Sequence, residues 1–181
     1  MNFLPSARLL VAAGLACSFM GVSASAEQVF SKDAGPVQAS CDGHAKGSAG
    51  WQACVGAARA DMSDDELFYA GYWLAKSGRY ADALIYLNLT RVKDERVLTY
   101  IGFATRKQGD VDKAMPFYAA ALDRNPDFVV ARAYLGEAYL TKGAPDRARA
   151  ELSQIAHRCG TTCPAYIDLD RHIAAYAAAH G

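Results

Sequence analysis

A triplet of small residues recurs three times along this chain, and it limits the possible folds more than any other feature does. Its first members are Gly71, Gly102 and Gly136. A second glycine follows each of them after seven residues and an alanine after five more, giving Gly78 and Ala83, Gly109 and Ala114, and Gly143 and Ala148. The last two triplets are 34 residues apart and the first two 31. A period close to 34 residues indicates stacked structural repeats.

Each triplet predicts two helices that pack closely against each other. The first glycine and the alanine have little or no side chain, so the two backbones approach where these residues meet, and bulky residues fill the space on either side. The second glycine supplies the turn that ends the first helix of the pair.

A helix-turn-helix unit with this period resembles the tetratricopeptide repeat (TPR) family, in particular small exported proteins of proteobacteria. The matching residues are Leu67, Ala70, Gly71, Leu74, Ala83 and Leu87 in the first unit; Leu98, Ile101, Gly102, Ala114, Tyr118, Ala121 and Pro126 in the second; and Leu135, Gly136, Tyr139, Ala148 and Leu152 in the third. Glu95, Arg132 and Gly160 depart from the pattern, and Pro116 should kink the second helix of its unit.

The resemblance implies an all-α fold, a solenoid of about three helical hairpins. The expected repeats span 63–94, 95–128 and 129–162, preceded by an arm over 27–62 with a short helix at 51–60. Ser63 and Glu66 have the spacing of a capping box, which marks a helix start. Residues 163–181 are expected to form a capping helix, because Tyr166, Leu169, Ile173 and Tyr176 recur on one helical face.

The first 26 residues are typical of a secretory signal peptide, so we expect a periplasmic or secreted protein. Arg8 is followed by an apolar run over 9–20 and by the small residues 24–26. That run is shorter than the roughly 20 residues of a membrane span. Lipidation at Cys17 is the alternative to cleavage after Ala26. No later stretch is long and apolar enough to span a membrane.

The composition of the remaining 155 residues argues against several functions. Their 18 basic and 19 acidic residues give no basic excess, so nucleic-acid binding has no support. Nucleophile, phosphate-loop and metalloprotease motifs are missing, which predicts a protein that is not an enzyme and needs no cofactor. The sequence leaves the oligomeric state open.

The TPR resemblance implies a concave groove lined by the first helix of each unit, which binds an extended peptide or a helix from a partner protein. The groove residues it implies are Phe68, Tyr72, Lys76, Thr99, Phe103, Arg106, Lys107 and Glu137, together with Ala133 and Thr141. Aromatic residues beside basic ones form a plausible anchor set. Alternatively, Tyr72 and Phe103 pack against neighbouring hairpins.

Four cysteines follow the signal peptide, and an even number in an exported chain predicts disulfides. Cys41, Cys54, Cys159 and Cys163 allow three pairings. Closeness along the chain favours Cys41 with Cys54 and Cys159 with Cys163. The alternative is a thiol-redox or metal-binding function for Cys159 and Cys163, with His157 and His172 as further metal ligands.

Overall fold

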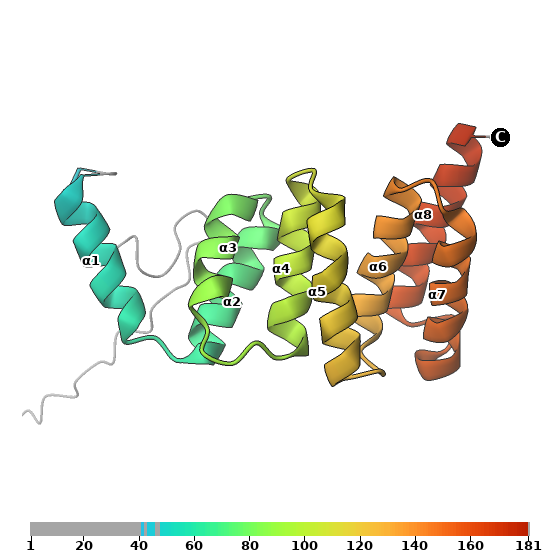
Figure 1. Cartoon of the computed structure of the whole chain (residues 1–181), viewed down its shortest axis with the longest axis horizontal. Helices are drawn as coiled ribbons and strands as arrows, with labels where there is room; N and C mark the ends of the chain where they lie inside the picture. Colours follow the sequence, from blue (N-terminus) through green and yellow to red (C-terminus); the bar gives the residue numbers. More distant parts are fainter. Residues whose placement is uncertain (1–40, 42, 46–47, 181) are drawn as a thin grey trace, which may run out of the picture.

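The computed structural model describes residues 41, 43–45 and 48–180, and this part of the chain folds into eight α-helices without a strand (Figure 1). The helices are α1 (Ala49–Ala60), α2 (Asp64–Lys76), α3 (Tyr80–Leu89), α4 (Glu95–Lys107), α5 (Val111–Arg124), α6 (Val129–Thr141), α7 (Pro145–Cys159) and α8 (Pro164–His180). The predicted all-α fold is confirmed. The expected signal peptide and Cys17 lie outside the described residues.

Local signals in the sequence explain where several helices begin and end. The backbone N–H of Glu66 donates to Ser63 Oγ at 3.3 Å, and that of Ser63 donates to Glu66 Oε2 at 2.8 Å, which completes the predicted capping box of α2. Proline opens α7 and α8, at the helix position that tolerates it best. The turn glycine Gly109 has φ +96°, a backbone conformation that other residues rarely adopt. The helix α5 continues through Pro116 to Arg124.

Small residues allow the paired helices to approach closely, as the triplets predict. A Cβ atom on Gly71 would lie 2.5 Å from Cγ of Leu87 in α3, and one on Gly102 would lie 2.7 Å from Cε1 of Tyr118 in α5. The third glycine differs, because the three atoms nearest a Cβ on Gly136 belong to Leu169 of α8. Gly136 therefore allows the capping helix α8 to approach α6 closely. The sequence predicted only a crossing of α6 with α7 at this position.

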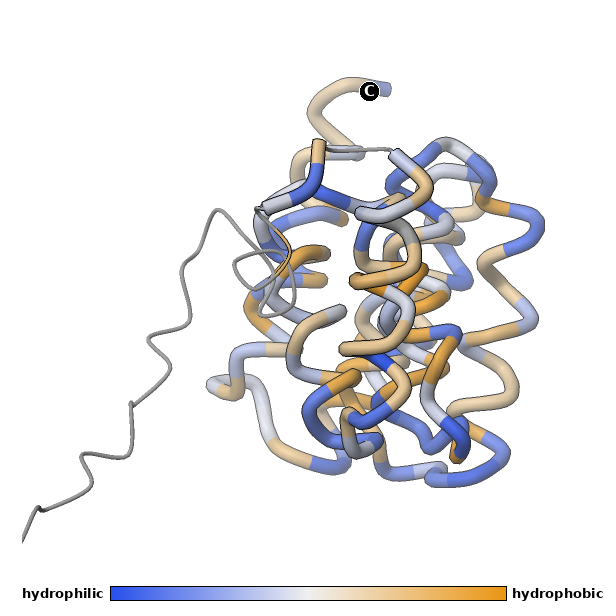
Figure 2. The backbone as a smooth tube through the Cα atoms, turned by 90° about the vertical axis from the view of Figure 1, so that its left-hand side faces the viewer, coloured by the Kyte–Doolittle hydropathy of each residue, from blue (hydrophilic) through white to orange (hydrophobic). Residues whose placement is uncertain are grey.

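The helices form two layers, and the contacts between them show which layer is on the inside of the curve. Helix α2 packs on α4, α4 on α6 and α6 on α8. In the described part of the chain, no comparable contact joins α3 to α5 or α5 to α7. The array therefore curves with α2, α4, α6 and α8 on its inner face. Viewed along the array of helices, hydrophilic stretches lie mostly at the turns, and hydrophobic stretches lie within the helices (Figure 2).

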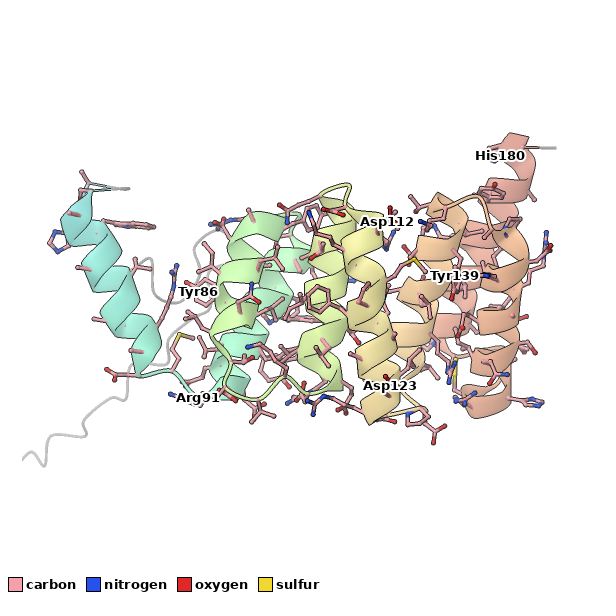
Figure 3. All side chains as sticks on the ribbon, viewed as in Figure 1. Tyr86, Arg91, Asp112, Asp123, Tyr139 and His180 are labelled. Carbon is pink, nitrogen blue, oxygen red and sulfur yellow. A yellow bond between two sulfur atoms is a disulfide. The ribbon has the colours of Figure 1, made fainter. Side chains whose placement is uncertain are left out.

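An additional helix covers the C-terminal end of the array, whereas α1 makes no comparable helix–helix contact in the described part of the chain. At the C-terminal end α8 packs on α6 and α7 and buries Leu169 and Ile173, two members of its predicted apolar face. At the other end the guanidinium of Arg59 in α1 lies 4.6 Å from the ring centroid of Tyr86 in α3; Figure 3 labels Tyr86. No helix in the described part of the chain has the length and apolar character needed to cross a membrane.

Candidate functional site

Aromatic rings form a continuous row along the inner face, from α2 through α4 to α6. We call Phe68, Tyr72, Tyr100, Phe103 and Tyr134 the aromatic row. The ring of Tyr100 lies 4.8 Å from that of Tyr72 and 6.0 Å from that of Tyr134, measured between centroids. Burial raises the pKa of Tyr100, and interactions with Tyr134 and then Tyr72 raise it further. The row therefore joins three successive repeats and fixes their spacing.

Two more rings lie beside the aromatic row but remain half exposed. Tyr69 is 49% exposed and Trp73 is 50% exposed. Trp73 meets Tyr72 edge-on, with ring centroids 5.0 Å apart, so the row supports it from one side. Successive helical residues are rotated by about 100°, which places Tyr69 and Trp73 on the side of α2 away from Gly71 and α3. They form an open aromatic surface, here called the aromatic patch.

A pocket of about 420 Å³ opens toward the other end of the inner face, and we call it the inner pocket. It is lined by residues from α4, α6 and α8, namely Arg106, Lys107, Glu137, Leu140, Thr141, His172, Tyr176 and His180. Its volume lies within the range of sites that bind small ligands, about 300–1,000 Å³. Because α8 supplies three lining residues, the inner pocket depends on the docking of that helix.

A nearly buried ion pair lies in the wall of the inner pocket. Arg106 Nη2 donates to Glu137 Oε2 at 2.6 Å, and the two side chains are 9% and 10% exposed. Arg106 Nε also donates to the hydroxyl of Tyr118 at 3.4 Å. Burial lowers the pKa of Arg106, but the charge of Glu137 and the contact with Tyr118 together leave it raised, so the guanidinium keeps its charge. The pair connects the second repeat to the third.

The remaining polar side chains of the inner pocket include the ammonium of Lys107 and two imidazoles. His172 Nε2 lies 3.8 Å from Glu137 Oε1, the oxygen that Arg106 leaves free. Lys107 makes no ion pair within the part of the chain that the structure describes, and its Nζ lies 5.7 Å from the ring centroid of Phe103. His180, at the far end of α8, stacks on Tyr176 with ring centroids 4.0 Å apart (Figure 3). Because Glu137 is paired with Arg106, the charge of Lys107 makes the pocket suited to an anionic ligand.

The groove residues expected from the sequence fall into two groups. The first group offers little surface to a partner, since Phe68, Thr99, Phe103 and Ala133 are 5%, 0%, 8% and 4% exposed. The rings of Phe103 and Tyr72 pack within the aromatic row, as the alternative interpretation of the sequence had it. The second group lies at the surface or in the inner pocket and consists of Tyr72, Lys76, Arg106, Lys107, Glu137 and Thr141.

Other residues of the site were not expected from the sequence. Successive helical spacings of four and three residues separate Tyr69, Trp73 and Lys76, a signal that places all three on one face of α2. His172, Tyr176 and His180 had no such signal, because α8 was expected only to cover the last repeat. Their role depends on how α8 docks, and sequence periodicity does not give that.

The structure joins Cys41 to Cys54 and Cys159 to Cys163, the pairing that closeness along the chain favours. The Cα atoms are 5.9 Å apart in each pair. The second disulfide spans the turn between α7 and α8, so it restrains the helix that completes the inner pocket. Among the described residues, no three His, Cys, Asp or Glu side chains lie together in a way that could hold a metal ion.

Comparisons with known proteins agree with this geometry. Residues 106–169 match the family model described as tetratricopeptide repeat. A solved structure of PcrH in complex with the chaperone binding region of PopB is similar to this chain, with a TM-score of 0.52 and 17% sequence identity. The similarity covers 64% of this chain and 98% of that one, and at this identity it shows the fold alone. No curated protein sequence matches the chain.

Proposed function

We propose that this chain, whose residues 106–169 match the tetratricopeptide repeat family, is a non-catalytic interaction module that binds a segment of a partner protein along its inner face. One observation carries the proposal. The inner face has the open aromatic patch of Tyr69 and Trp73 on α2 and the inner pocket between α4, α6 and α8. Large aromatic residues are the most frequent energetic anchors of protein interfaces.

The inner face is well suited to hold an extended segment because its shape is fixed before the partner arrives. The aromatic row and the Arg106–Glu137 pair connect adjacent repeats, so little conformational entropy is lost on binding. Covering the exposed halves of Tyr69 and Trp73 contributes about 1 kcal/mol for each ring. The similar solved structure was determined with a segment of another protein, which is in keeping with this mode of binding.

We place this activity outside the cytosol, in the periplasm or the extracellular medium. The two disulfides support that location, since disulfides persist in oxidising compartments. The expected signal peptide over residues 1–26 points the same way.

Thiol exchange at Cys159 and Cys163 is the competing function, and a different observation separates it. An interaction module purified without reductant should contain no reactive thiol, because both pairs remain oxidised. A thiol count that finds Cys159 and Cys163 free and reactive would favour the redox function instead.

Trp73→Ala is expected to weaken partner binding about tenfold, since truncating a central aromatic anchor commonly costs about 1–2 kcal/mol or more. Peptides selected from a random displayed library on the full chain serve as ligands, and calorimetry gives their affinities. Leu89→Ala is the matched control, because Leu89 is 46% exposed and lies on α3, outside the inner layer.

The control variant should bind the selected peptides as the unmodified chain does, and both variants should melt as the unmodified chain does. Equal binding by the Trp73 variant, or a loss of binding confined to the Leu89 variant, would place the partner on a different surface and refute the proposal.

A further inference from the structure

Building on the proposed function, we propose that the inner pocket binds acidic side chains of the partner, carried at alternate positions of an extended segment. The pocket gathers Lys107 from α4 with His172 and His180 from α8. Its carboxylate, Glu137, already has a partner in Arg106 at 2.6 Å. An anionic ligand therefore meets the ammonium of Lys107, imidazole groups that can donate hydrogen bonds, and an acidic group whose charge is already compensated.

The helix dipole explains part of this arrangement, but not all of it. Lys107 lies in the last turn of α4 and His180 in the last turn of α8, where the helix dipole favours positive charge. That preference acts on each helix separately. It does not account for the convergence of these side chains on one pocket, nor for His172, which lies in the middle of α8.

The spread of the nitrogen-bearing side chains distinguishes an acidic segment from a single chain terminus. His172 and His180 are eight residues apart on α8, which corresponds to about 12 Å at the helical rise of about 1.5 Å per residue. One terminal carboxylate does not reach across that length. In an extended peptide, side chains two and four residues apart point the same way at about 7 and 13 Å. Alternating acidic residues therefore match the spacing along α8.

The apolar part of the lining fits the same ligand. Leu140 and the ring of Tyr176 lie among the polar groups of the pocket. They offer a surface for the methylene groups of glutamate side chains, while the carboxylates reach the charged groups.

Three pools of 12-residue peptides test this inference on the immobilised full chain. The first pool carries Glu at three alternate positions with random neutral residues elsewhere, and both of its ends are capped. The second pool has Gln at those positions. The third is the Gln pool with a free C-terminal carboxylate. Because solvent-exposed ion pairs contribute up to about 1 kcal/mol each, the unmodified chain should retain the Glu pool about tenfold better than the capped Gln pool.

Lys107→Glu should reduce this preference to about onefold, because it replaces an attraction by a repulsion. Lys113→Glu is the matched control, since it makes the same change of charge on α5 at a side chain that is 78% exposed and outside the pocket. It should keep the preference for Glu.

The remaining outcomes separate this inference from the proposed function. Equal retention of the Glu and capped Gln pools, with both lost in Trp73→Ala, would overturn the acidic segment but leave partner binding on the inner face intact. Preference for the pool with a free terminus would overturn it in favour of a terminal carboxylate. Failure to retain any pool would also overturn it, whereas binding of the separately selected peptides tests the proposed function alone.

Discussion

Gly102→Leu is expected to lower the free energy of unfolding by about 3 kcal/mol, at the upper end of the usual cost of overpacking a core. Even a Cβ atom at this position would lie 2.7 Å from the ring of Tyr118. That ring has no room to move aside, since Tyr118 is 0% exposed and its hydroxyl accepts a hydrogen bond from Arg106. The two helices of the second repeat would have to separate. Chemical denaturation monitored by circular dichroism measures the change.

Gly56→Leu provides the control for this substitution. Gly56 lies in α1, and nothing is found within 4 Å of a Cβ placed there. Leucine also has the higher helix propensity, so this variant should be as stable as the unmodified chain or slightly more stable. Equal stability of the Gly102 and Gly56 variants would mean that α4 and α5 do not cross at Gly102.

Glu137→Gln is expected to cost about 3 kcal/mol of stability, because it leaves the charge of Arg106 buried without a carboxylate. Gln keeps the size of the side chain, so loss of charge and not loss of packing accounts for the effect. Replacing both partners, as in Arg106→Met with Glu137→Leu, should restore most of the stability, since a buried ion pair and an apolar pair of similar volume are often equivalent. Denaturant unfolding of both variants measures these changes.

An exposed ion pair gives the matched comparison. Arg171 Nη2 lies 2.6 Å from Asp168 Oδ1, the same distance as in the buried pair, but these side chains are 70% and 56% exposed. Asp168→Asn should therefore change the stability by less than about 0.5 kcal/mol. If the two single variants lost the same stability, Arg106 and Glu137 would not be the buried link between repeats that the structure shows.

The sequence predicted the hairpins because their determinants are local. Gly71 and Gly102 mark the close crossings, and the Ser63–Glu66 capping box marks the start of α2. It did not predict that Leu169 packs on Gly136, because that contact joins the last helix to the third repeat between residues that are far apart in the sequence. A triplet pattern describes a hairpin and not the helix that follows it.

The functional site was less predictable because it also depends on contacts between helices that are distant in the sequence. Helical spacing places Phe68, Tyr72 and Phe103 on one side of their helices, but it does not say whether that side meets a neighbouring helix or solvent. The structure buries Phe68 and Phe103 and leaves Trp73 half exposed. The inner pocket needed the docked α8 as well, since His172 reaches Glu137 only across a helix–helix contact.

The most direct test of partner binding on the inner face is a nuclear magnetic resonance titration of the ¹⁵N-labelled full chain with a selected peptide. The chain has two tryptophans, Trp73 in the aromatic patch and Trp51 in α1, so their indole N–H signals serve as probe and internal reference. The account predicts that the Trp73 signal and backbone amides of α2, α4, α6 and α8 shift, while Trp51 and the exposed residues of α3 stay unchanged. Shifts confined to α3, α5 and α7, with the Trp73 signal unmoved, would contradict it.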